Sequence, residues 1–239
     1  MSTILVTGGS GGIGQALIRR LSAAGHQLLF TYCRGSDKAR QLAQDTGAQS
    51  VAYDQSSAES VRQLAALVRG GEFDALVNNG AAPPGRQLLL KMDADAFVAY
   101  QVAALRGVFE LSTAFAARAR ERQMPGAIVN VLTTYTLGLP PAKLSAYVTS
   151  KYALLGLTRS MAVEFVRYGV RVNAVSPGVT RTEFIADLPE RFIEQMEAGL
   201  PMERIATPQE VASVICFLLS PEASYMTGVN VPVSGGQSC

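Results

Sequence analysis

The stretch TGGSGGIG, residues 7–14, directly follows the apolar residues 4–6 and leads into a helix-like segment, residues 13–24. A glycine-rich turn between a strand and a helix lets backbone N–H groups approach a pyrophosphate, and the helix N-terminus favours negative charge. Glycines alone also make tight turns, so the flanking strand and helix are what favour nucleotide binding. We therefore predict that a dinucleotide contacts Gly8, Ser10, Gly12, Ile13 and Gly14.

Beyond this loop, short apolar runs alternate with helix-like segments along the whole chain. The pattern predicts strands at residues 3–7, 27–32, 50–53, 75–77, 127–132, 170–175 and 228–233, and helices at residues 13–24, 56–69, 97–121, 147–168 and 208–219. Most of the strand candidates lack polar alternation, which is typical of strands covered on both faces. We expect one α/β domain over residues 1–239, a Rossmann-type, doubly wound parallel sheet of about seven strands with helices on both faces.

The composition limits the partners of this domain. The formal charge is +2, from 21 basic and 19 acidic residues without a basic stripe, which argues against nucleic acid as a ligand. No apolar run approaches the ~20 residues of a membrane span. Hydrophobic residues make up 48% and charged residues 17% of the chain, which indicates further apolar burial between subunits.

Cysteine and histidine usage points to a reducing compartment. Cys33, Cys216 and Cys239 are far apart, and His26 is the single histidine, beside a predicted strand. This predicts neither a metal site nor a disulfide framework. The N-terminal residues do not resemble a signal peptide, so we expect a cytoplasmic protein.

The residues that end the second predicted strand indicate which dinucleotide the protein binds. An acidic residue there would bind the ribose hydroxyls of NAD, whereas this chain has Arg34 and Ser36. Both can donate hydrogen bonds to a 2′-phosphate, and arginine suits planar, multidentate phosphate contacts. Asp37 comes late, and we expect it to cap the following helix. NADPH/NADP+ is therefore the predicted cofactor.

A second motif has the chemistry of proton transfer. Tyr147 and Lys151 lie one helical turn apart in the sequence YVTSK, so both side chains should face one site. A free tyrosine has a pKa of about 10, and a nearby cation is expected to lower it, which makes the phenol a usable acid and base. A tyrosine and a lysine four residues apart are common on helix surfaces, so the pair alone is weak evidence. It indicates a catalytic site because it follows the glycine loop in the same strand–helix pattern.

Together these motifs resemble the short-chain dehydrogenase/reductase family over nearly the whole chain. The matching positions are the loop at residues 7–14, Asp54, Asn78-Asn79-Gly80, the Tyr147/Lys151 pair, Asn173 and Pro177-Gly178. The resemblance implies that Asp54 contacts the adenine, that Asn78 supports cofactor and sheet, and that Lys151 holds the nicotinamide ribose. Further cofactor contacts that it implies are Gln55, Gly80, Pro177, Gly178, Val179, Thr180 and Thr182.

Three positions depart from the family pattern. Gly80-Ala81 reverses the usual Ala-Gly order, which is expected to loosen this turn. The serine beside the catalytic tyrosine is replaced by Thr133 when counted from the strand, or by Thr134 when counted back from Tyr147, and we favour Thr134. The family asparagine on the fourth helix, thought to position a water that relays protons to the lysine, is Ala104.

Within the family, the chain is similar to 3-oxoacyl-[acyl-carrier-protein] reductases of fatty acid or polyketide biosynthesis. That resemblance implies reduction of a 3-oxoacyl thioester, with Tyr147 as the acid, Lys151 beside it and Thr134 or Thr133 orienting the substrate oxygen. The alternatives are a small ketone, sugar or polyketide intermediate as the substrate, or a weakly catalytic nucleotide-binding regulator.

The resemblance and the remaining sequence suggest three further features. Residues 178–207 break the strand–helix rhythm and are expected to form a substrate lid; the alternative is a plain surface excursion. Arg118, Arg120 and Arg122 offer a basic surface to an acidic carrier protein, although a solvated helix end is the simpler interpretation. The family resemblance implies a homotetramer formed through the fourth and fifth helices and the last strand.

Overall fold

Seven parallel strands form the central sheet, in the order β3-β2-β1-β4-β5-β6-β7. The computed structural model describes residues 1–83, 85–183, 185 and 188–237, so Cys239 lies outside the described residues. The strands are β1 (Thr3–Val6), β2 (Gln27–Tyr32), β3 (Gln49–Ala52), β4 (Ala75–Asn78), β5 (Gly126–Val131), β6 (Val170–Pro177) and β7 (Asn230–Val233). The predicted doubly wound parallel sheet is confirmed.

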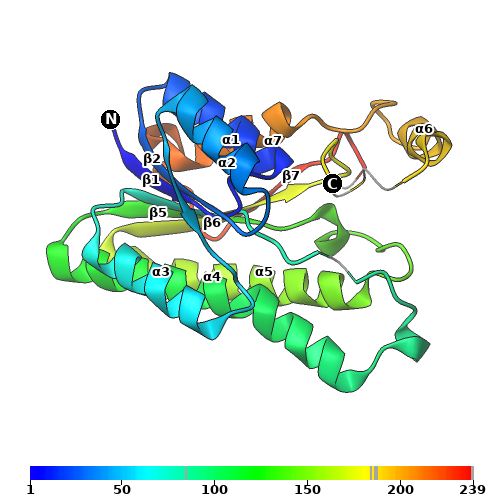
Figure 1. Cartoon of the computed structure of the whole chain (residues 1–239), viewed down its shortest axis with the longest axis horizontal. Coiled ribbons are helices and arrows are strands. Elements are labelled where there is room, and N and C mark those ends of the chain that lie inside the picture. Colours follow the sequence, from blue (N-terminus) through cyan, green and yellow to red (C-terminus); the bar gives the residue numbers. More distant parts are fainter. Residues whose placement is uncertain (84, 184, 186–187, 238–239) are drawn as a thin grey trace.

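Helices cover both faces of this sheet (Figure 1). One layer contains α1 (Gly12–Ala23), α2 (Ser36–Thr46) and α7 (Pro208–Leu219), and the other contains α3 (Ala58–Gly70), α4 (Ala94–Arg122) and α5 (Ser145–Phe165). A further helix, α6 (Glu190–Ala198), lies beyond the end of the sheet. Short 3-10 turns are η1 (Leu89–Lys91), η2 (Thr134–Thr136), η3 (Val166–Tyr168) and η4 (Pro221–Ala223). Among the described residues, no helix is both long and apolar enough for a transmembrane segment.

The two faces of the sheet support two separate cores, which explains why the strands lack polar alternation. Successive side chains of a strand point to opposite faces. Accordingly Val6 packs in the core under α1 and α7, whereas its neighbour Leu5 packs in the core under α3, α4 and α5. Val129 and Ile128 of β5 divide between the two cores in the same way.

Strand order places the site. The chain proceeds from β1 outward to β3 and then returns to β4 on the other side of β1. The connections that follow β1 and β4 therefore run in opposite directions along the sheet. The carboxyl ends of these two strands border the crevice in which doubly wound sheets bind ligands. The glycine loop follows β1 at this point, and the Asn78-Asn79-Gly80 turn follows β4.

The structure corrects or completes three local expectations about helices. Asp37 does not cap α2; Gly35 occupies that position with φ of 71°, and Asp37 lies in the first turn, where its charge still suits the helix dipole. The weak helical pattern within residues 178–207 corresponds to α6. Helix α4 begins at Ala94, earlier than predicted, because the Asp93 side chain accepts a hydrogen bond from the Ala96 N–H (2.9 Å).

The described residues of the 178–207 segment form an excursion with a small core of their own; residues 184, 186 and 187 lie outside the described residues. Ile185, Ile193, Leu200 and Ile205 are buried together, and a parallel bridge between Thr180 and Ala206 closes the base. This segment lies at the carboxyl edge of the sheet, beside the crevice (Figure 1). Its placement suits the predicted lid, and closure over a substrate stays a prediction.

A buried polar network joins the sheet to the α4–α5 layer. Asn78 Nδ2 donates to Asn130 Oδ1 (2.8 Å) and to Ser112 Oγ (3.1 Å), and Asn130 Nδ2 donates to Thr158 Oγ1 (2.9 Å). Asn130 is fully buried on β5. The family resemblance implies that Asn78 supports the sheet, and these hydrogen bonds show how it does so.

Replacing Asn130 by alanine should destabilise the fold, because the Asn78 amide and the Thr158 hydroxyl each lose a buried hydrogen-bond partner and a small cavity remains. We expect a loss of about 2–4 kcal/mol in the free energy of unfolding, measured by urea denaturation. The matched control Gln63→Ala, on the exposed side of α3, should change it by less than about 0.5 kcal/mol. A loss at Asn130 no larger than that of the control would contradict the role of the network.

Candidate active site

The glycine loop is shaped by contacts that leave no space for side chains. A Cβ at Gly14 would lie 2.3 Å from the Gly8 carbonyl oxygen, and one at Gly8, where φ is 64°, would lie 2.8 Å from the Gly80 Cα. No side chain of the described residues caps the N-terminus of α1, which begins at Gly12. The first-turn N–H groups therefore remain available to an anion, as dinucleotide binding at Gly12, Ile13 and Gly14 requires.

Thr7 and Asn79 tie this loop to the turn after β4. The Thr7 hydroxyl oxygen accepts hydrogen bonds from the N–H groups of Asn79 (3.0 Å) and Gly80 (2.9 Å). Asn79 Nδ2 donates to the carbonyl oxygens of Thr7 (3.0 Å) and Gly8 (2.9 Å). Thr7 and Asn79 belong to the two sequence motifs, but the motifs alone did not predict either of them as a site residue. These hydrogen bonds are present with the Gly80-Ala81 order, because they are made by the Thr7 hydroxyl, the backbone and the Asn79 amide.

The turn after β6 closes the other side of the loop. The Gly178 N–H donates to the Val233 carbonyl (2.9 Å), and buried Thr180 donates to the Gly178 carbonyl (3.0 Å). Thr182 reaches the glycine loop, since a Cβ at Gly12 would lie 2.6 Å from its Cγ2. The structure thus places this predicted segment beside the loop, with Pro177 at the end of β6 and Val179 against the small core of the 178–207 segment.

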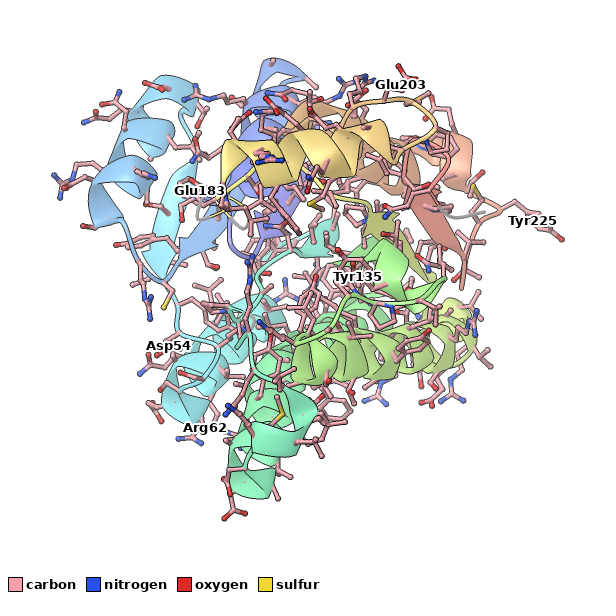
Figure 2. The ribbon with its side chains drawn as sticks, turned by 90° about the vertical axis from the view of Figure 1, so that its right-hand side faces the viewer. Asp54, Arg62, Tyr135, Glu183, Glu203 and Tyr225 are labelled. Carbon is pink, nitrogen blue, oxygen red and sulfur yellow. The ribbon has the colours of Figure 1, made fainter. Side chains whose placement is uncertain are left out.

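The residues predicted to bind the adenine and its ribose lie at the carboxyl ends of β2 and β3. Arg34 is exposed and close enough to Asp54 to contribute to the lowered pKa of that carboxyl, whose main cause is hydrogen bonding from Ser56. The Ser56 hydroxyl and N–H reach Asp54 Oδ1 at 2.6 and 2.9 Å. Ser36 begins α2 next to Arg34. Figure 2 shows Asp54 and Glu183 on the same side of the carboxyl edge, the latter paired with Lys38 (3.4 Å).

Tyr147 and Lys151 face one buried site, as their spacing predicts. Both lie in the first turns of α5, with exposed fractions of 8% and 7%. The Lys151 ammonium is 5.7 Å from the centre of the Tyr147 ring and donates to the Val131 carbonyl at the end of β5 (2.7 Å). Strand β5 therefore orients the lysine next to the phenol.

Burial controls the proton affinities of the pair. It raises the pKa of Tyr147 to about 12, with a hydrogen bond from Thr133 acting in the opposite direction, and it lowers the pKa of Lys151 to about 8. The expectation of a depressed tyrosine pKa is thus wrong for this arrangement, because loss of hydration outweighs the hydrogen bond from Thr133. A protonated phenol at neutral pH is the form that can donate a proton.

Thr133, not Thr134, is the hydroxyl that contacts Tyr147. Thr133 continues β5 in an extended conformation, whereas Thr134 begins the 3-10 turn η2 and is buried there. Counting from the strand therefore gave the right neighbour. Counting back from Tyr147 failed because the turn between η2 and α5 sets that spacing; Tyr135, within η2, lies near the middle of this edge in Figure 2.

Ala104 and Gln55 lie behind this pair. Both line a small cavity that also reaches Tyr147 and Lys151, so the position of the missing family asparagine does face the site. Gln55 also approaches Gly80, whose Cβ would lie 3.5 Å from the Gln55 Oε1. Among the described residues, no cluster of histidine, cysteine, aspartate or glutamate suits a metal ion.

The arginines at the end of α4 do not form a basic surface beside the site. Arg118 is fully buried and donates to the Phe73 carbonyl. Arg122 donates to the carbonyls of Gly70 (2.8 Å) and Gly71 (3.2 Å). These residues lie at the amino end of the strands, opposite to Tyr147, because α4 runs antiparallel to them. The solvated or structural interpretation of this helix end holds for Arg118 and Arg122.

Comparisons with known proteins agree with this geometry. A family model described as enoyl-(acyl carrier protein) reductase matches residues 8–238. The acetoacetyl-CoA reductase of Shinella zoogloeoides is 33% identical, covering 98% of this chain and 97% of its own. The cyclic-di-GMP-binding biofilm dispersal mediator protein of Escherichia coli K12 is also 33% identical, over 98% and 95%.

Solved structures give the same result. A putative betaketoacyl-ACP reductase is 38% identical with a TM-score of 0.86, covering 98% of this chain and 97% of that one. BdcA in complex with NADPH is 32% identical with a TM-score of 0.87, over 98% and 93%. The chain belongs to the short-chain dehydrogenase/reductase family and is an oxidoreductase that uses a nicotinamide cofactor.

The shifted pKa of Lys151 predicts a pH-dependent stability. Below pH 8 the fold must bury an ammonium, whereas between pH 8 and about 10.4 the folded protein holds a neutral amine while the unfolded chain still binds the proton. Stability of the wild type relative to Lys151→Met should therefore rise with pH from 7.5 to 9.5 in urea unfolding. Lys91→Met, on an exposed 3-10 turn, should show a pH-independent difference. A pH-independent difference for Lys151→Met as well would contradict the burial effect.

Proposed function

We propose that the protein is an NADPH-dependent carbonyl reductase that reduces a 3-oxoacyl thioester to the 3-hydroxyacyl product. The single observation behind the proposal is the buried Tyr147 phenol, hydrogen-bonded to Thr133 and one helical turn from Lys151, beside the glycine loop. Ketoreduction as the general reaction follows from the family. The thioester is supported by acetoacetyl-CoA reductase and ketoacyl-ACP reductase among the similar proteins.

The residues of this chain supply the proton and the orientation. NADPH, when bound, supplies the hydride that reduces the carbonyl carbon. Tyr147 donates its phenolic proton to the carbonyl oxygen as negative charge develops there, which completes the alcohol. The Thr133 hydroxyl lies beside the phenol and can donate a hydrogen bond to the same carbonyl oxygen, which orients it. Lys151 stabilises the phenolate left behind, because its positive charge lies in a site with little water.

Apolar side chains around the carboxyl edge favour an acyl substrate. Large exposed apolar residues follow β4, β5 and β6 in the chain, which places them in the loops that border the crevice. They are Leu88, Leu89, Leu90, Leu137, Leu139, Phe192 and Met202. The last two belong to the 178–207 segment, whose role as a lid over the substrate forms part of the proposal. Loops at this position carry specificity in such sheets.

The Tyr147→Phe variant tests the function. With NADPH and a 3-oxoacyl thioester of a carrier protein or CoA, wild type should turn over and the variant should lose about 100-fold or more in kcat, the usual value of a general acid. NADPH binding, followed by its fluorescence, should change less than about threefold because a Phe ring keeps the packing. Lack of thioester turnover, with reduction of small ketones or sugars instead, would replace the proposed substrate.

Preference for NADPH depends on the 2′-phosphate contact of Arg34. Arg34→Ala should raise the Kd for NADPH about tenfold and leave that for NADH within about twofold, since a charge-assisted hydrogen bond is lost only with the phosphate. Titration of each dinucleotide measures both constants. Equal weakening of the two dinucleotides would remove the assignment, and Arg40→Ala, exposed on α2, serves as the control.

A regulatory nucleotide-binding role is the second candidate, favoured by the similarity to a cyclic-di-GMP-binding mediator and by Ala104. It keeps the fold and NADPH binding but needs no proton donor. NADPH binding by both wild type and Tyr147→Phe, with no oxidation over a broad carbonyl panel, would support this role over the reductase.

We further propose a homotetramer, in the cytoplasm, formed through α4, α5 and β7. Val102, Phe109, Tyr152 and Val163 leave large apolar surfaces exposed on α4 and α5 of a single chain. Light scattering should give a particle of four 25.3-kDa chains. Phe109→Arg should reduce the particle to dimers or monomers, because a desolvated charge opposes the interface. A monomeric wild type would refute the assembly. An acidic acyl carrier protein stays a proposed partner without an assigned surface.

A further inference from the structure

Two small cavities lie side by side behind the catalytic pair. They share Gln55, Gly80, Ala104 and Val108 among their lining residues. The near cavity continues to Tyr147, Ser150 and Lys151, and the far cavity continues to Tyr53 and Asn78. Ala104 and Val108 both project from α4 at the shared wall, and the single methyl group of Ala104 occupies little of the space.

Polar atoms without a partner lie in the walls of these cavities. Among the described residues, the buried atoms that make no hydrogen bond include Gln55 Nε2 and Asn78 Oδ1. One is a donor and the other an acceptor. Leaving such atoms unpaired in the interior is costly, which makes water the expected partner.

The space suits individual waters. Each cavity leaves about 10 Å3 for the centre of a water molecule, close to what one ordered water needs. Lys151 supplies a further partner, because its ammonium has three N–H donors and the described contacts use one, to Val131. The near cavity also extends to Ala81, which is exposed and opens a route to bulk water.

We propose that each cavity holds one water, and that Gln55 positions the near water so that it accepts a hydrogen bond from Lys151. Gln55 is then a positioning residue for proton supply: the proton that Tyr147 gives to the substrate is replaced from bulk water by way of the near water and Lys151. Asn78 holds the far water through its free Oδ1. This role of Gln55 rests on the proposed reductase function, whereas the two waters do not depend on it.

A test that needs no turnover measures the proton affinity of Lys151. The pH dependence of its acetylation by acetic anhydride, followed by mass spectrometry in the cofactor-free protein, gives the pKa. Gln55→Leu removes the donor that holds the near water, so the pKa of Lys151 should fall by about one unit or more, the value of a hydrogen bond to a charged group. The exposed control Gln63→Leu should leave it unchanged. An unchanged pKa in Gln55→Leu overturns the proposal, even if the enzyme reduces thioesters.

Kinetics then separate proton supply from cofactor binding. Gln55→Leu should lower kcat about tenfold and raise the solvent deuterium isotope effect on kcat, with the Kd for NADPH within about threefold of wild type. Adding Ala104→Asn to this variant should restore kcat, because its amide enters the same space. Weaker NADPH binding with an unchanged isotope effect would make Gln55 a cofactor contact and overturn the inference. A wild type without turnover would remove the reductase function, while the acetylation result would still decide on the water.

Discussion

The close approach of two backbone turns is the constraint on which the site depends. Gly8 and Gly80 come so near that a Cβ at Gly8 would lie 2.8 Å from the Gly80 Cα, and the Thr7 hydroxyl accepts from both N–H groups of the turn after β4. This contact joins the ends of two neighbouring strands, β1 and β4. The glycine loop held by this contact leads into α1, whose N-terminus has no side-chain cap among the described residues and thus favours an anion such as pyrophosphate.

Burial is the second determinant of the chemistry. Tyr147 and Lys151 are more than nine-tenths buried, and the loss of water shifts both pKa values toward the neutral forms. The phenol holds its proton more tightly than a free tyrosine does, and the pKa of the lysine lies closer to neutrality than that of an exposed lysine. The hydrogen bond to Val131 and the cavity behind the lysine then decide where its remaining N–H groups point.

Sheet topology separates the roles of the two edges. Loops after β4, β5 and β6 bring apolar residues and the 178–207 segment to the carboxyl edge, where Tyr147 and Lys151 also lie. Helix α4 connects this edge to the opposite one, so Ala104 lines the cavity beside Tyr147 and Lys151 while Arg118 is buried at the other end of the helix. A cluster that looks functional in the sequence can therefore serve only the packing at the other end of the same helix.

The sequence by itself determined the fold class, the glycine loop and the pairing of Tyr147 with Lys151. These features depend on local patterns: strand periodicity, the glycine spacing and one helical turn. Only the tertiary structure decided that Thr133 contacts the Tyr147 phenol and that burial raises the pKa of this tyrosine. It also decided that Thr7 and Asn79 join the two turns. The position of Gln55 beside Ala104 likewise came only from the structure. Each of these depends on how segments distant in the chain pack together, and hydration and side-chain direction are set by that packing.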